Sequence, residues 1–420
     1  MSTGVAEPKE EEREKQKQVK SPAYEREELL NGCQAVAQAV RLADVDVIAA
    51  YPIRPYTEVM DAISKIIADG ELDAEYIVAD SEHSQFEIVK HASSVNARAF
   101  AGSSGTGWMY GFEALVVTAS DRLPPVFLVG NRALDDPGAF GVEHNDAMAL
   151  RDMGWLLVWV TTPQEALEHI LLAYRIAEDK RVRMPCAVAM DGAFLTHSQH
   201  MVKIPSKSAV KQFLPPYDLA ERRMHPDNPI SVAPQVNEDW VMELRRQNWE
   251  AAKRARGVIK EAYEEFNGVF GARYTTPYFE EFMTDDAKVV LIGLGQVSAA
   301  GRTAARRLRA KGQKVGYITL RWFRPFPTHE LRESLKRFHA VGVIDRDFAH
   351  GSVDDGGILL HEIRSLLYPV EKRPVVTNYI TGLGGRDISI ADCEKMFTLT
   401  QESVGRTEMN GQVTWIGLRE

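Results

Sequence analysis

Short apolar segments alternate with helical segments along most of this 420-residue chain, and this alternation constrains the fold more than any other feature. In the first half, strands are expected at 45–50, 75–79, 97–101 and 126–130, with helices between them. Strands that alternate with helices indicate βαβ units and a parallel sheet, so we predict an α/β fold. Because ligands of such sheets bind beyond the carboxyl ends of the strands, the candidate segments for a site are 51–55, 80–83, 102–107 and 131–144.

A second α/β unit is expected in the last third of the chain. A strand at 289–292 is followed by the turn Gly293-Leu294-Gly295, and further strands are expected at 315–320 and 341–345. The proline-rich stretch 203–234 separates the two units. The predicted regions are a charged N-terminal tail at 1–28, a first α/β domain at 29–202, a linker with a helical segment at 203–284, and a second α/β domain at 285–420.

The composition argues against several classes of partner. Asp and Glu outnumber Lys and Arg by 59 to 50, which argues against nucleic acid. The three cysteines, Cys33, Cys186 and Cys393, are too widely separated to form a four-cysteine zinc or iron–sulfur site. No apolar run approaches the roughly 18 residues that span a bilayer. We therefore expect a cytoplasmic protein with no nucleic-acid partner, no membrane partner and no metal site of its own.

Three charged residues at strand ends are candidates for chemistry. Glu82 begins an expected helix, where a carboxylate binds a ligand nitrogen or acts as an acid or base; a simple capping role is the alternative. Arg54 and Arg132 stand at the ends of two other expected strands, and two guanidinium groups placed there would grip a carboxylate. The alternative for either arginine is an ion pair with Asp135 or Asp136.

Two glycine-rich turns suggest nucleotide binding, but each of them lacks part of the required motif. The Gly293-Leu294-Gly295 turn lacks a third glycine, and no acid follows the next strand to hold a ribose. The turn at 102–105 lacks the lysine of a phosphate-binding loop. We expect a Rossmann-like second domain that binds no NAD, and an NAD-binding dehydrogenase subunit stays the alternative.

Four sequence segments together indicate a family. They are YPIRP at 51–55, SEHS at 81–84, GSSGTG at 102–107 and NRALDDPG at 131–138. In this order they resemble the α subunit of 2-oxoacid:acceptor oxidoreductases of the ferredoxin type, over about residues 29–400. The resemblance implies that 29–202 is a pyrimidine-binding thiamine diphosphate domain and that 285–420 is a transketolase C-terminal-like domain.

The resemblance also implies roles for single residues. Glu82 would bond N1′ of the pyrimidine ring and so activate the cofactor. Arg132 would grip the substrate carboxylate, with Arg54 beside it. The other expected cofactor contacts are Pro52, Ile53, Ser104 and Gly105.

The chain lacks two parts that this chemistry requires. The GDG signature that binds diphosphate and Mg²⁺ is absent, the nearest match being Met190-Asp191-Gly192, and there is no cysteine cluster. The resemblance therefore implies a hetero-oligomer. A β subunit would carry the diphosphate-binding domain with Mg²⁺, and γ and ferredoxin-like δ subunits would carry [4Fe-4S] clusters. An NAD-linked flavoprotein with FAD is a further candidate partner, and coenzyme A would capture the acyl group.

The choice of 2-oxoacid rests on few side chains. Arg54 stands where pyruvate-type members usually carry Thr, and the YPIRPYT form resembles oxalate oxidoreductase, which carries an acid at the position of Ala139. Trp108, Phe112 and Phe140 would give the pocket an aromatic wall. We therefore expect phenylglyoxylate oxidoreductase of anaerobic aromatic degradation, which yields benzoyl-CoA and CO₂, ahead of oxalate and then pyruvate. The alternatives are that Trp108 and Phe112 are helix core, and that the chain is a non-catalytic assembly subunit.

Overall fold

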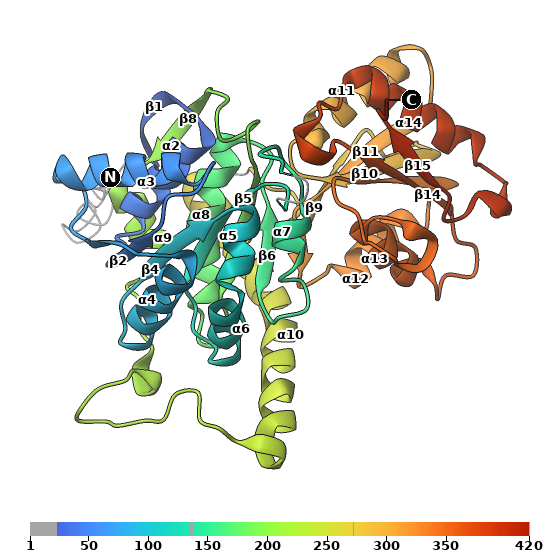
Figure 1. Cartoon of the computed structure of the whole chain (residues 1–420). Helices are drawn as coiled ribbons and strands as arrows, with labels where there is room; N and C mark the ends of the chain where they lie inside the picture. The colour runs from blue at the N-terminus through green and yellow to red at the C-terminus, as the bar shows by residue number, and fades with distance from the viewer. Residues whose placement is uncertain (1–22, 135–137, 272, 420) are drawn as a thin grey trace, which may run out of the picture.

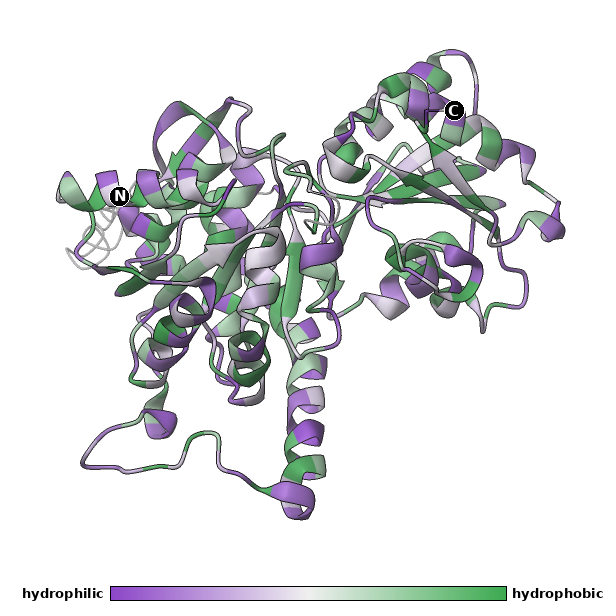
Figure 2. Ribbon diagram, viewed as in Figure 1, coloured by the Kyte–Doolittle hydropathy of each residue, from purple (hydrophilic) through white to green (hydrophobic). Residues whose placement is uncertain are grey.

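The structure is a computed structural model that describes residues 23–134, 138–271 and 273–419. It consists of two α/β domains, each built on a mainly parallel sheet (Figure 1). Figure 2 shows apolar residues along the strands and many polar residues on the outer turns of the helices. The predicted α/β class is therefore confirmed.

The first domain has a seven-stranded sheet in the order β12-β6-β7-β5-β4-β2-β3, in which β12 alone runs antiparallel to its neighbour. The strands are β2 (Val47–Ala50), β3 (Glu75–Val78), β4 (Ala99–Ser103), β5 (Val126–Asn131), β6 (Leu156–Trp159), β7 (Cys186–Asp191) and β12 (Trp322–Arg324). Strands β4, β5 and β7 are buried along their whole length. Their nearly continuous apolar sequence follows from the helices on both faces of the sheet.

Helices surround this sheet. They are α2 (Gly32–Leu42), α3 (Thr57–Ala68), α4 (Glu82–Ser94), α5 (Gly105–Tyr110), α6 (Phe112–Ser120), α7 (Asn145–Met148), α8 (Pro163–Ala177) and α9 (Lys207–Phe213). Helix α8 is buried on nearly every side because α2 and α10 pack against it. Between β4 and β5 the chain forms two helices, α5 and α6, which meet at Gly111. Gly111 lies so close to Phe86 that a side chain there would collide with its ring.

The predicted N-terminal tail at 1–28 is partly wrong. Residues 1–22 lie outside the described residues, but β1 (Tyr24–Leu30) is a strand that pairs antiparallel with β8 (His200–Pro205). The sequence of β1 alternates between half-buried and exposed residues, which is the pattern of a strand with one covered face. Its high charge hid that alternation in the sequence.

Helix α10 (Asn237–Phe270) is 34 residues long and lies in the region predicted as a linker with a helical segment. Its C-terminal half is buried on one side at Ala251, Ala255, Ile259 and Phe266 and packs against α8 and α9. Its N-terminal part projects away from the first domain (Figure 1). Among the described residues, none of the helices combines the length and the apolar character that crossing a bilayer requires.

The second domain has a six-stranded sheet in the order β15-β14-β13-β10-β11-β9, with β9 antiparallel. The strands are β9 (Phe279–Phe282), β10 (Val289–Leu294), β11 (Val315–Leu320), β13 (Ala340–Asp345), β14 (Val375–Thr381) and β15 (Val413–Ile416). The α-helices are α11 (Val297–Ala310), α12 (Thr328–Leu335), α13 (Ile358–Leu367) and α14 (Ile390–Glu402). Short 3₁₀ turns lie at Ala220–Arg222, Val353–Asp355, Leu383–Gly385 and Thr407–Met409.

The chain of the second domain contributes one strand, β12, to the sheet of the first domain. After β11 the chain returns to the first sheet, where β12 pairs with β6. Trp322 of β12 is fully buried, and its Nε1 donates to the Tyr263 hydroxyl at 3.0 Å. Next to it, Arg321 forms an ion pair with Glu165 of α8 at 3.3 Å. A length of chain within 285–420 therefore completes the first domain, although the sequence placed all of that range in the second.

Candidate active site

Glu82 is the first residue of α4, at the edge of the sheet where β3 ends. Ser81 caps this helix by accepting a hydrogen bond from Ser84 N at 3.2 Å, so Glu82 is not the residue that caps it. Glu82 is only 6% exposed. Within the part of the chain that the structure describes, its carboxylate has no hydrogen-bond or ion-pair partner. A nearly enclosed carboxylate that has no protein partner is typical of a residue that completes its bonding with a ligand.

The glycine turn between β4 and α5 lies directly against Glu82. A Cβ at Gly107 would overlap Glu82 Oε1 and lie 2.6 Å from Ile53 Cδ1, so a side chain there would displace the carboxylate. Gly105 has a φ of +52°, a conformation that favours glycine, and a Cβ there would lie 3.1 Å from Nε of Arg132. The turn therefore places Glu82 on one side and Arg132 on the other.

Arg132 follows β5 and is 5% exposed. Its Nη1 donates to the backbone oxygen of Arg54 at 3.1 Å, and its guanidinium lies over the Phe140 ring at 5.0 Å. The Arg54 side chain is exposed and has no hydrogen-bond or ion-pair partner among the described residues. The structure thus brings Arg132 to the main chain of Arg54 rather than pairing the two side chains. Asp135 and Asp136, the alternative partners of either arginine, lie outside the described residues.

The other predicted cofactor contacts surround the same turn. Pro52 is exposed, Ile53 is half-buried against Gly107, and Ser104 and Gly105 are buried. The hydroxyl groups of Ser103 and Ser104 are buried without a hydrogen-bond partner in the described chain. The glycine turn, its two unpartnered hydroxyls and the unpaired carboxylate together fit a polar, flat heterocycle such as the pyrimidine ring of thiamine diphosphate.

Asp146 is a residue of this site that the sequence did not single out. Its carboxylate is fully buried and accepts hydrogen bonds from the backbone N–H groups of Gly105 and Arg132, both at 3.0 Å. It also accepts bonds from Asn131 Nδ2 at 2.8 Å and Ala147 N at 2.7 Å. Burial raises the pKa of Asp146 to about 6, although these four bonds favour the charged form. In the sequence, Asp146 is one acid among several in a long loop.

The aromatic wall expected around the substrate is largely absent. Trp108 is fully buried, with its ring in edge contact with Phe86, Phe127 and Trp155. The structure therefore corrects its predicted role: Trp108 is a core residue. Phe112 is partly buried and packs against the same core. Phe140 is 75% exposed and is the one aromatic of the predicted wall that contacts Arg132.

The Gly293-Leu294-Gly295 turn, which suggested dinucleotide binding, is filled by the protein itself. Gln296 N, at the start of α11, donates to Asp191 Oδ2 at 2.9 Å, and a Cβ on Gly295 would lie 2.6 Å from the same carboxylate. Asp191 also accepts bonds from His144 Nε2 at 2.8 Å and from Arg346 Nη1 at 3.3 Å. A carboxylate thus occupies the place where a dinucleotide would put its pyrophosphate. This argues against the NAD-binding alternative.

Asp191 is also the residue of the near match to the diphosphate–Mg²⁺ signature. Both of its oxygens are bonded to protein groups, and the pKa of Asp191 is lowered: burial alone would raise it, but His144 and Arg346 stabilise its charge. Among the described residues, no three His, Cys, Asp or Glu side chains come together as a metal site.

Comparison with known proteins agrees with this geometry. The family described as "Pyruvate flavodoxin/ferredoxin oxidoreductase, thiamine diP-bdg" matches residues 38–264, and "Pyruvate:ferredoxin oxidoreductase core domain II" matches residues 287–393. The chain is 38% identical over 392 residues to pyruvate synthase subunit PorA of Methanocaldococcus jannaschii, covering 93% of this chain and 98% of the relative. It is 35% identical over 395 residues to ketoisovalerate oxidoreductase subunit VorA of Pyrococcus abyssi, covering 93% and 98%.

Two solved structures share the fold. A 2-oxoglutarate:ferredoxin oxidoreductase from Magnetococcus marinus superimposes with a TM-score of 0.66 at 17% identity, over 90% of this chain and 65% of that chain. An inactive split-gene transketolase tetramer gives a TM-score of 0.53 at 12% identity, over 91% and 99%. These two likenesses concern the fold alone, while the family matched by residues 38–264 is described as thiamine-diphosphate-binding.

Proposed function

This chain belongs to the pyruvate flavodoxin/ferredoxin oxidoreductase family, and from this membership we propose that it is the α subunit of a thiamine-diphosphate-dependent complex that oxidises a short-chain 2-oxoacid, pyruvate first, with coenzyme A. It is thus a subunit of an enzyme that acts on the oxo group of its donor. The observation that carries the proposal is the nearly buried, unpaired carboxylate of Glu82 against Gly107.

Glu82 would act on the cofactor ring. When bound, thiamine diphosphate supplies a carbon nucleophile for the 2-oxo carbon and an electron sink after CO₂ leaves. Glu82 would hold a proton at N1′ of the pyrimidine, because its carboxylate has no other partner in the described chain and little contact with water. The absence of a side chain at Gly107 lets the Glu82 carboxylate lie directly against the main chain of the turn.

Arg132 would bind the substrate carboxylate. Its guanidinium is nearly buried, and an ionic hydrogen bond is stronger there than in water. The Phe140 ring against it would shield the pair from solvent. The Arg54 side chain is free to approach a second negative group, which is the feature that keeps oxalate among the substrates to test.

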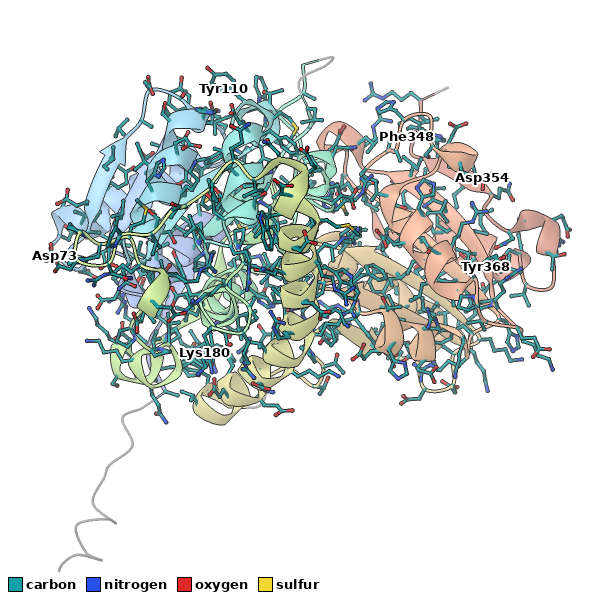
Figure 3. All side chains as sticks on the ribbon, turned by 90° about the horizontal axis from the view of Figure 1, so that it is seen from below. Asp73, Tyr110, Lys180, Phe348, Asp354 and Tyr368 are labelled. Carbon is teal, nitrogen blue, oxygen red and sulfur yellow. The ribbon has the colours of Figure 1, made fainter. Side chains whose placement is uncertain are left out.

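Exposed apolar side chains border the site and support a partner subunit. Val78 at the end of β3, Tyr110 at the end of α5 and Phe140 are 66%, 65% and 75% exposed. Figure 3 shows Tyr110 on the outside of the first domain. Exposed apolar side chains that form one patch mark an interaction surface, and we propose that these three belong to one. A β subunit seated here would supply the diphosphate and Mg²⁺ site; the iron–sulfur subunits, a flavoprotein partner and a cytoplasmic location stay predictions.

The preferred substrate changes from that expected from the sequence. The sequence favours phenylglyoxylate because it predicts an aromatic wall, but Trp108 lies in the core. The curated relatives compared here carry the names of pyruvate and ketoisovalerate enzymes. Pyruvate therefore leads, a branched 2-oxoacid follows, and phenylglyoxylate and oxalate are the remaining candidates.

The test is a turnover assay on the assembled complex with coenzyme A and a viologen dye as electron acceptor. Pyruvate is expected to give the highest kcat/KM among pyruvate, 2-ketoisovalerate, phenylglyoxylate and oxalate. Glu82→Gln is expected to reduce turnover by at least 100-fold while the complex still assembles. Glu113→Gln is the matched control, since the Glu113 side chain is 83% exposed on the neighbouring helix α6. Full activity of Glu82→Gln would remove the proposed role.

A further inference from the structure

We propose that Asp146 is a positioning residue that locks Arg132 onto the cofactor turn at Gly105 and so sets the affinity for the 2-oxoacid. This inference rests on the proposed function of Arg132. The Asp146 carboxylate does not contact Glu82 or the Arg132 guanidinium. It contacts the main chain of Gly105 and Arg132 and the neighbouring groups of Asn131 and Ala147.

The geometry of Asp146 joins three elements. Oδ2 receives the N–H groups of Gly105, at the start of α5, and of Arg132, directly after β5. Oδ1 receives Asn131 Nδ2 and Ala147 N. A single oxygen thus fixes the distance between the cofactor turn and the backbone of the substrate arginine.

Asp146 also closes the loop that carries the site. Arg132 stands at the start of the loop between β5 and α7, and Asp146 is the second residue of α7, directly after that loop. A second bond, from Ala133 N to Gly141 O at 2.8 Å, ties the loop together above it. With its backbone held in this way, the Arg132 guanidinium reaches the Arg54 carbonyl and the Phe140 ring. Displacing a binding group by about 1 Å can cost on the order of 100-fold in kcat/KM, so the position of Arg132 matters.

The chemistry of the site requires a carboxylate. All four partners of Asp146 are N–H donors, two to each oxygen. An asparagine of the same shape has one accepting oxygen, and its NH₂ group would face two of these donors in either orientation. Asp146→Asn therefore leaves no cavity, but it breaks the bonds of one oxygen and loosens either Arg132 and Gly105 or Asn131 and Ala147.

The experiment measures steady-state kinetics of Asp146→Asn in the assembled complex. We expect the KM for pyruvate to rise by about 10- to 100-fold, while kcat changes by less than about threefold. Thiamine diphosphate binding, measured by calorimetry, is expected to persist, because Glu82 is untouched. Glu168→Gln is the matched control: Glu168 is a fully buried carboxyl on α8, bonded to Tyr274, Arg273 and Gln164. A KM increase of equal size in Glu168→Gln would mean a general structural effect and would overturn the proposal.

A double-mutant cycle tests separately whether Arg132 binds the 2-oxoacid and whether Asp146 acts through Arg132. If Asp146 acts through Arg132, Asp146→Asn adds nothing to the KM of an Arg132→Ala complex, whereas independent effects would multiply. An unchanged KM in Arg132→Ala refutes the proposed function itself. A raised KM in Arg132→Ala with an unchanged KM in Asp146→Asn refutes only the role of Asp146. If the Asp146→Asn complex fails to assemble, Asn131→Ala takes its place, because it removes one donor to Asp146. The proposal is supported if Asn131→Ala raises the KM for pyruvate in the wild-type complex but does not raise it further in the Arg132→Ala complex. An unchanged KM in Asn131→Ala overturns the proposal.

Discussion

Removing Asp191 should destabilise the contact between the two domains more than any surface substitution. Asp191 is fully buried at the end of β7 and is bonded to His144, Gln296 N and Arg346. Burial already lowers the pKa of Arg346, even with Asp191 beside it. Asp191→Ala would leave that guanidinium buried with only the backbone oxygens of Gly382 and Arg386 as hydrogen-bond acceptors. A buried charge that loses its partner costs about 3–5 kcal/mol.

The assay is urea and thermal unfolding of the assembled complex. At about 2–4 °C per kcal/mol for a unit of 150–250 residues, Asp191→Ala should lower Tm by roughly 6–20 °C. The Tm of Asp191→Asn, which keeps the shape of the side chain and one acceptor oxygen, should lie between the Tm of Asp191→Ala and that of the wild type. Asp152→Ala is the control: Asp152 pairs with Arg324 at 3.5 Å, but its side chain is 60% exposed, so the loss should stay under about 1 kcal/mol. Equal losses in Asp191→Ala and Asp152→Ala would refute the reasoning.

Two further predictions concern stability. Arg321, His169 and Thr161 outweigh the effect of burial and lower the pKa of Glu165 to about 2. The Glu165 carboxylate therefore adds on the order of 3 kcal/mol to the free energy of unfolding above pH 4.5, and this contribution is lost as pH falls toward 2. Acid unfolding of Glu165→Gln should accordingly be shallower over that window than in wild type, and parallel curves would contradict it. Trp108→Ala should cost about 3–5 kcal/mol because it empties the aromatic core, yet leave the pyruvate KM within about twofold. A large change in the pyruvate KM of Trp108→Ala without a loss of stability would mean that Trp108 lines the substrate pocket after all.

Local sequence patterns predicted the strands and helices that their own residues determine. The apolar run at 126–130 became β5, and the helix expected from Ser81 became α4, because strand burial and helix capping depend on neighbouring residues. Strand β12 could not be predicted in the same way. Trp322–Arg324 follows β11 after a single residue, and only its pairing with β6, more than 150 residues away, makes it a strand of the other sheet.

The site residues divide along the same line. Glu82 and Arg132 were found because they stand at strand ends, where a parallel sheet places its ligands. Asp146 was missed because its four donors come from three elements, and nothing in the loop sequence separates it from Glu143. Trp108 was misplaced because an aromatic residue after a glycine turn looks the same in the sequence whether its ring faces a pocket or the core.

The second domain supports the site from outside the first sheet. Its Rossmann-like turn receives Asp191 in place of a ligand phosphate, so the crevice at the ends of β10 and β13 serves to dock the domains. The same contact reaches the substrate loop: His144 N donates to Arg346 O at 2.9 Å, and Gly385 N donates to Val142 O at 3.1 Å. A side chain at Gly141 would collide with the backbone of the second domain. The described parts of this loop, 131–134 and 138–144, therefore contact both Asp146 and the second domain. The contact of the second domain with Asp191 thus also bears on the position of the residues proposed to bind the substrate.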